Sequence, residues 1–156
     1  MIRKVGSLII FLALCLIVSS LGGWITQTSV NDWYQNLAKP PLSPPDWVFA
    51  PTWITLYVIM AVSAWRIWSR SAGSLRQLAM LVFAIKLALN LAWPFIFFGA
   101  QSPGFAAIEI VALWMAIFAT LLTFWRIDRV AGWLMCPYLL WVSFAIYLNV
   151  SIFFMN

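Results

Sequence analysis

The chain has 156 residues, of which 65% are hydrophobic and only 8% are charged, with a net charge of +5. This composition excludes an ordinary soluble domain and indicates a protein that lies in a membrane. The absence of histidine removes imidazole as a general base, metal ligand or haem ligand, and the two cysteines lie in apolar segments, so we expect no metal site. The basic residues form no continuous tract, so we expect no nucleic-acid partner.

Five apolar segments follow one another along the chain, each close to the roughly 20 residues that cross a bilayer as a helix. They run over residues 5–26, 47–68, 77–98, 105–125 and 130–154. We therefore predict an all-α fold, with residues 1–156 forming one integral membrane domain of five transmembrane helices. The first segment resembles a signal peptide, with Arg3 and Lys4 before an apolar core. We expect a retained helix, because the apolar run continues through Trp24 and Ile25.

The basic residues are divided unequally between the two sides of the predicted bundle. Seven of the nine lie in the N-terminal tail or in the connections after the second and fourth segments: Arg3, Lys4, Arg66, Arg70, Arg76, Arg126 and Arg129. Lys39 is the one basic residue in a connection on the other side. Because loops rich in Lys and Arg stay in the cytoplasm, we expect a cytoplasmic N-terminus and an external C-terminus.

One connection is long and the others are short. Residues 101–104 and 126–129 are tight turns, which make the helices they join antiparallel neighbours. The loop 27–46 is longer and carries two Pro-Pro pairs, and long ordered loops are often lids. We expect a short helix over residues 32–37 capped by Asn31, with Trp33 and Tyr34 holding the loop over the mouth of the bundle. The alternative is a mobile loop along the membrane surface.

The third segment has a polar, aromatic face and a face of small residues. Helical spacing puts these side chains on one side: Lys86, Asn90, Trp93 and Phe97. An ionisable side chain at membrane depth usually faces a bundle interior or cavity, so we expect this face to line a pocket. The opposite side carries a ladder of small residues: Ala84, Ala88 and Ala92. Such ladders let membrane helices approach closely, so we expect a dimer interface here, or else a contact within the bundle.

Other segments supply further candidates. Trp53 and Tyr57 share a face of the second segment, Phe105 and Glu109 share a face of the fourth, and the fifth carries Tyr138, Trp141, Ala145 and Leu148. Glu109 is level with Trp93 and about 12 Å from the depth of Lys86, so we expect no direct Lys86–Glu109 pair. Trp53, Trp93 and Trp141 come from three helices, and their indoles would suit a large flat ring system such as a porphyrin.

Three stretches resemble the signature sequences of the TspO/MBR family of translocator proteins. They are WYQNLAKPPLSPPDWVFAPTWITLY at 33–57, ALNLAWPFIFFG at 88–99 and CPYLLWVSFAIYLN at 136–149. The resemblance implies a five-helix bundle in a bacterial cell membrane, a homodimer, and binding of a porphyrin such as protoporphyrin IX with no required cofactor. It also implies a role in transport, sensing or stress-related handling of porphyrin; the alternatives are light-dependent porphyrin degradation, or a small-solute carrier or channel.

The resemblance and the helix faces together indicate the ligand-binding residues. They are Trp33, Trp53, Tyr57, Lys86, Asn90, Trp93, Phe97, Phe105, Glu109, Tyr138, Trp141, Ala145 and Leu148, with residues 33–46 as a lid. Trp53 and Trp141 match the tryptophans that would act as catalytic residues if the protein degrades porphyrin photochemically. Acid–base or hydrolytic catalysis has few candidates, because the sequence shows no histidine and no nucleophile–base pair.

Three features depart from the family pattern, two of them single positions and one the C-terminal segment. Leu42 stands where many members have tryptophan, and Lys86 stands where glutamine is common, which would add a cation to the pocket wall. Asn90, Asn149, Lys39 and Lys86 are the candidates that could meet the carboxylates of a porphyrin. No basic residue follows Tyr147, so the usual C-terminal cholesterol motif is absent and we expect no specific sterol binding.

Overall fold

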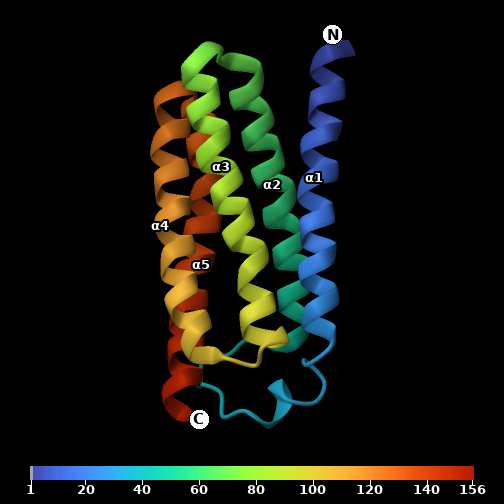
Figure 1. The fold of residues 1–156 in the computed structure, drawn as a ribbon, viewed down its shortest axis with the longest axis vertical. Coiled ribbons are helices and arrows are strands. Elements are labelled where there is room, and N and C mark those ends of the chain that lie inside the picture. The colour runs from blue at the N-terminus through green and yellow to red at the C-terminus, as the bar shows by residue number, and fades with distance from the viewer. Residues whose placement is uncertain (1) are drawn as a thin grey trace.

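The computed structural model describes the backbone of residues 2–156 and the side chains of residues 5–156. Its long helices are α1 (Ile2–Gln27), α2 (Phe49–Arg70), α3 (Gly73–Pro94), α4 (Pro103–Ile127) and α5 (Arg129–Met155) (Figure 1). All five are long and apolar enough to cross a membrane, which confirms the predicted all-α fold. The side chains of Arg3 and Lys4, on which the predicted orientation partly depends, lie outside the described residues.

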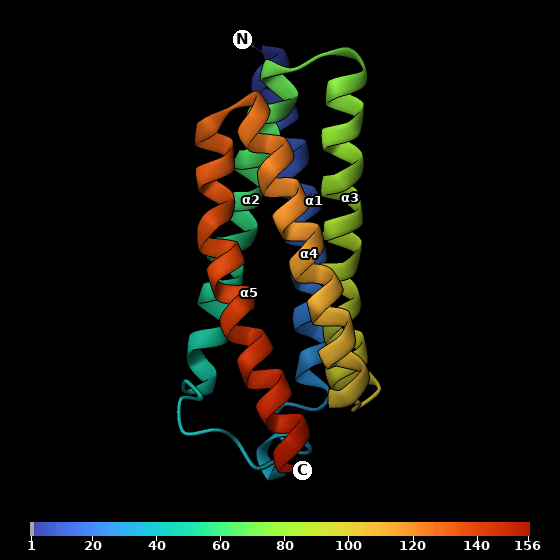
Figure 2. The ribbon, with the colours of Figure 1, turned by 90° about the vertical axis from the view of Figure 1, so that its left-hand side faces the viewer.

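The helices form one bundle with α1 at its side. Helix α1 packs against α2 and α3, away from α4 and α5 (Figure 1). Helices α4 and α5 lie next to each other and cross in front of α1 and α2 in Figure 2. The N-terminus lies at one end of the bundle, and the C-terminus lies at the other end beside the long loop between α1 and α2.

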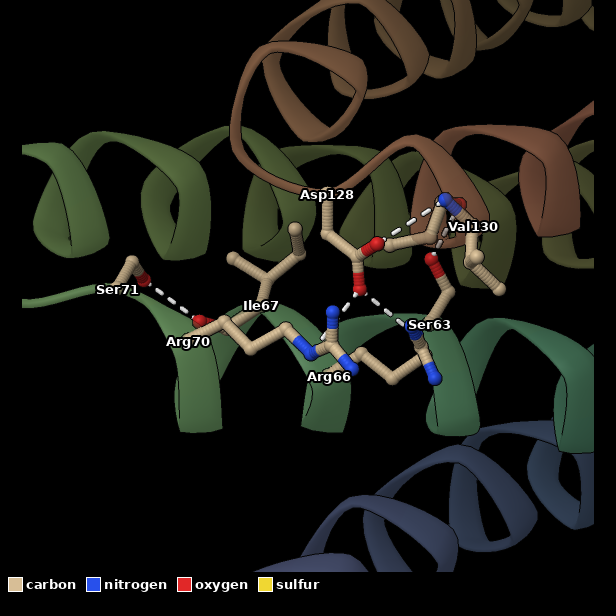
Figure 3. Close-up of polar contacts among 8 residues, drawn as sticks. Ser63, Arg66, Ile67, Arg70, Ser71, Asp128 and Val130 are labelled. Carbon is tan, nitrogen blue, oxygen red and sulfur yellow. Dashed lines mark hydrogen bonds and ion pairs between the residues drawn. The ribbon is translucent and has the colours of Figure 1, made fainter.

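At the N-terminal end, Asp128 ties three helices together (Figure 3). Its carboxylate accepts a hydrogen bond from the Val130 amide (3.0 Å), which caps α5, and another from Arg66 Nε (2.8 Å) on α2. The Nε atom of Arg70, also on α2, lies 3.5 Å from Asp128 Oδ2. Burial alone would raise the pKa of Asp128, but the Arg66 and Val130 hydrogen bonds and the charges of Arg66 and Arg70 outweigh it and hold the pKa below its usual value.

The last turn of α3 is wider than an α-helix. Pro94 has no N–H to donate, so the helical hydrogen-bond ladder is interrupted there. The chain continues as a π-turn over Phe95–Gly99, in which the Ala100 amide donates to the Phe95 carbonyl (2.8 Å). This turn points Phe97 and Phe98 into the bundle, where both are buried.

The loop between α1 and α2 is attached to the bundle at three places. Ser29 Oγ donates to the Phe98 carbonyl (2.8 Å), the Tyr34 ring packs against Phe98 (5.6 Å between centroids), and Asn156 exchanges two hydrogen bonds with the Ala38 backbone. The expected helix over residues 32–37 is only a 3₁₀ turn, Tyr34–Asn36, without a side-chain cap. The tertiary contacts of Tyr34 position this segment, so it does not need a capped helix.

Candidate functional site

A cavity of about 460 Å³ lies inside the bundle at the end covered by the loop. All five helices contribute to its wall, and Val30 and Tyr34 of the loop close it at the end of the bundle. Burial raises the pKa of the Tyr34 hydroxyl. Cavities of this size accommodate small organic ligands, and the wall here is mostly apolar with a few polar groups.

Three tryptophans from different helices meet in this cavity. They are Trp53 on α2, Trp93 on α3 and Trp141 on α5. The rings of Trp53 and Trp141 are nearly perpendicular, with centroids 6.4 Å apart, whereas Trp93 stacks on Phe97 at 5.0 Å. Phe97, Ala145 and Leu148 complete the set of predicted residues on this apolar part of the wall. The arrangement offers both ring faces and ring edges to a flat aromatic ligand.

A chain of hydrogen bonds forms the polar part of the wall. The Tyr138 hydroxyl donates to Asn90 Oδ1, and Asn90 Nδ2 donates to the Tyr57 hydroxyl oxygen. Both ends of the buried Asn90 amide are therefore satisfied, which keeps Tyr57 and Asn90 in place at the cavity surface. The Trp93 indole is held in the same way, since its Nε1 donates to Asn149 Oδ1 (3.0 Å).

The Trp141 indole differs from these groups. Among the described residues, its Nε1–H is buried and has no hydrogen-bond partner, although the ring lines the cavity. A buried donor without a partner costs free energy, and a ligand oxygen in the cavity would satisfy it. Trp141 therefore provides both an aromatic surface and a free donor.

Lys86 is not where the helix face of α3 placed it. Its side chain is completely buried, one helical turn below Asn90, and does not line the cavity. The amine donates to Met60 Sδ (3.1 Å) and lies 4.2 Å from the Phe83 ring centre and 5.1 Å from that of Tyr138. Among the described lining residues, the one charged side chain is instead Asp46, in the 3₁₀ turn Asp46–Val48 that precedes α2.

Four other predicted residues also lie outside the cavity. Tyr138 is buried behind Asn90. Trp33 and Phe105 line a shallow groove on the outer surface near the ends of α4 and α5, where Phe105 is 72% exposed. Both carboxylate oxygens of Glu109 are buried without a hydrogen-bond partner in the described part of the chain, and no ion pair joins it to Lys86. Helix faces alone did not distinguish these positions from the cavity wall.

Helix α1 also contributes to the cavity wall, which was not predicted from the sequence. Ser19, Gly22, Gly23 and Thr26 line the cavity, as do Phe49 of α2 and Ile110 and Leu113 of α4. The small residues at 19–23 were a usable signal, because small side chains leave space beside a helix.

Comparison with known proteins is consistent with this architecture. The sequence profile of the TspO/MBR family matches residues 11–155. The chain belongs to the TspO/MBR family. Its TspO/MBR relatives include the tryptophan-rich protein TspO of Chlorobaculum tepidum, which is 38% identical over 99% of this chain and 98% of the relative. Protein CrtK of Rhodobacter capsulatus is 36% identical over 82% of this chain and 81% of the relative. The translocator protein of Sus scrofa is 36% identical over 87% of this chain and 84% of the relative.

Membership of the TspO/MBR family and the five apolar helices identify an integral multi-pass membrane protein. The bilayer is therefore the surroundings of the bundle, which accounts for its many exposed apolar side chains, such as Ile9, Leu81 and Phe154. Exposed apolar side chains of this kind suit a lipid-facing surface.

Proposed function

We propose that this TspO/MBR protein binds a porphyrin of the protoporphyrin IX type in the internal cavity, for its transport or sensing. The observation that carries the proposal is the meeting of Trp53, Trp93 and Trp141 around one cavity of about 460 Å³. A macrocycle with an extended π system gains from offset and edge-to-face contacts with all three rings. A relative from Cereibacter sphaeroides is named tryptophan-rich sensory protein, which supports the sensing role.

The charges around the cavity favour one orientation of such a ligand. No described cation lines the wall, and Lys86 is sealed behind it, so the apolar end would receive the ring and not its carboxylates. Lys39 lies on the loop, with its amine 4.1 Å from the centre of the Tyr34 ring, and Tyr34 lines the cavity. The carboxylates would therefore point toward the loop, where Lys39 and water would compensate their charge and that of Asp46, the lining carboxylate on that side, whose Oδ2 accepts a hydrogen bond from Gln35 Nε2.

Quenching of tryptophan fluorescence by protoporphyrin IX tests the proposal. Trp141→Ala should weaken binding by about 0.5–1.5 kcal/mol beyond the lost contact area, which is roughly two- to twelvefold. The matched control is Trp133→Ala on the same helix, because Trp133 is exposed and lies outside the cavity. Equal dissociation constants for the wild type, Trp53→Ala and Trp141→Ala would contradict this site.

Light-dependent degradation of the bound porphyrin is the second candidate. It is favoured by the close approach of Trp53 and Trp141, which line the cavity with ring centroids 6.4 Å apart. Illumination of the complex distinguishes it from simple binding. Loss of the porphyrin absorption bands that needs both tryptophans supports degradation, whereas a loss equal to that of free porphyrin supports binding alone.

A further inference from the structure

The cavity wall is exposed on one side only. Among the described lining residues, the exposed ones are Leu16, Ser20, Gly23, Gln27, Asp46, Ala50 and Ile54. All of these belong to α1 or to the first part of α2 and the turn before it. The lining residues of α3, α4 and α5 are buried or half-buried, and so are Val30 and Tyr34 of the loop.

The exposed residues form two facing edges. On α1, residues 16, 20, 23 and 27 follow the spacing of a single helix face, and on α2 residues 50 and 54 are one turn apart. On the neighbouring face of α1, Gly22 is buried, and a Cβ there would lie 3.3 Å from Pro94 of α3. At this level α1 is therefore packed against α3, and the exposed lining residues lie on its other side, toward α2.

The opening faces the lipid rather than the water. It runs along parts of α1 and α2 that lie inside the membrane-spanning segments. Hydroxyl groups on the α1 side are already satisfied, because Ser20 Oγ donates to the Leu16 carbonyl and Thr26 Oγ1 to the Gly22 carbonyl, each at 2.8 Å. Along the spanning segments the rim therefore presents small and apolar groups, and the polar Gln27 and Asp46 stand at its loop end, which suits the passage of an amphipathic ring.

We propose that the cavity exchanges its ligand directly with the bilayer through this lateral opening between α1 and α2. This rests on the proposed function and narrows the ligand class to amphipathic rings that dissolve in the membrane. Gly23 is the gap in the rim, since its missing side chain leaves the space between the helices clear. The attached loop acts as an end wall of the cavity and is not the entrance.

Filling the gap tests this route. No atom lies within 4 Å of a Cβ added at Gly23, so a side chain there starts in open space, and we expect the ring of Gly23→Phe to narrow the opening. Ile54→Trp narrows the opening from α2, where Ile54 is 51% exposed. Gly6→Phe is the matched control, because Gly6 is equally unobstructed on α1 but lies outside the cavity wall. Stopped-flow quenching of tryptophan fluorescence by protoporphyrin IX in liposomes measures the rates of ligand association and dissociation.

Both filling variants should slow association and dissociation at least tenfold, whereas Gly6→Phe should match the wild type. Rates within threefold of the wild type in both filling variants would overturn the lateral route. Faster exchange on releasing the loop with Tyr34→Ala, with no effect of Gly23→Phe, would move the entrance to the loop.

A second measurement does not depend on porphyrin. With Cys15 and Cys136 replaced by alanine, Ser19→Cys puts a thiol on the cavity wall behind the opening. A lipid-soluble maleimide should label it faster than a water-soluble one, and Gly23→Phe should slow that labelling. Faster labelling by the water-soluble reagent would contradict the route, even if porphyrin binds. Normal lateral labelling without any porphyrin quenching would contradict the proposed function alone.

Discussion

Lys86 is a buried amine whose burial is expected to cost free energy. It is completely buried, and no ion pair involves it in the part of the chain that the structure describes. A thioether and two aromatic rings are weak substitutes for water around an amine. The lysine therefore works against the stability of the bundle, and the cavity wall separates its amine from the cavity.

Replacing this amine with an apolar group should stabilise the protein. Lys86→Met should raise the unfolding free energy by about 1–4 kcal/mol, because it replaces a buried amine with an apolar side chain of similar volume. Thermal unfolding in detergent measures this, with Leu87→Met as a neighbouring buried control. Porphyrin affinity should change little. A tenfold loss of affinity would show that the amine reaches the ligand.

Asp128 is the opposite case, a buried charge whose partners are all present. Asp128→Ala removes the Arg66 ion pair and the cap of α5, and should cost about 2–4 kcal/mol. Asp128→Asn keeps an acceptor for the Val130 amide and should cost less.

The pH dependence of Asp128 follows from its lowered pKa. A group whose pKa is lower in the folded state stabilises the fold above its unfolded pKa, and this contribution disappears as the pH falls through the folded pKa. The difference in thermal midpoint between the wild type and Asp128→Asn should therefore be full at neutral pH and shrink below the usual aspartate range, about pH 4. Asp32→Asn, on the exposed loop, is the control. A difference that is constant with pH would contradict the ion pair.

Among the elements, the loop between α1 and α2 and the π-turn of α3 depend on each other. The π-turn presents Phe97 and Phe98, and these rings hold Tyr34 against the cavity. The Phe98 carbonyl also accepts the hydrogen bond from Ser29. The loop is therefore ordered by contacts with a distant part of the chain and not by its own prolines alone.

Hydrogen exchange of residues 28–45 should report this attachment. Tyr34→Ala should accelerate exchange of the loop amides at least tenfold, because it removes a buried aromatic side chain worth about 3–5 kcal/mol. Leu42→Ala, at an exposed loop position, should leave exchange unchanged. Bound protoporphyrin IX should slow exchange in the wild type, since Tyr34 lines the cavity. Exchange that is equally fast with and without porphyrin would argue against a loop that covers the ligand.

For the molecule as a whole, the small-residue face of α3 is available to a second copy. Ala84 and Ala88 are exposed and Ala92 is half-buried, so this face does not pack into the bundle along its whole length. Small residues let two helices approach closely in lipid, where packing drives association. We propose a two-fold dimer through this face, which leaves the opening between α1 and α2 free.

Cysteine crosslinking in membranes checks the dimer. In a chain without Cys15 and Cys136, Ala88→Cys should crosslink two copies, whereas Asn90→Cys, which is buried at the cavity, should not. Crosslinking at position 90 and none at position 88 would place the interface elsewhere.

Orientation in the membrane is also a property of the whole molecule. The described cations Arg66, Arg70, Arg76, Arg126 and Arg129 lie at the N-terminal end, and Lys39 lies at the loop end. The excess of basic residues predicts that the N-terminal end is cytoplasmic. In the same cysteine-free chain, an impermeant maleimide should label Ala38→Cys in intact cells and Ala72→Cys only after permeabilisation. The reverse pattern would invert the orientation.

The sequence by itself determined the five helices and their order. Length and apolarity are local properties, so the segment 105–125 predicted α4, Pro103–Ile127, to within two residues at each end. The tight turns around residues 101 and 128 also followed from local composition. The three tryptophans of the cavity were identified because aromatic side chains on separate helices, together with the family resemblance, indicated a common site.

Only the tertiary structure decided which polar side chains reach the cavity. Lys86 and Asn90 share a helix face, yet Asn90 lines the cavity and Lys86 is sealed below it. Periodicity gives the direction of a side chain around its own helix, but not the depth at which neighbouring helices close over it. For the same reason the place of Glu109 and the opening beside Gly23 depend on how α1, α4 and their neighbours pack, because a cavity is the space that several helices leave between them.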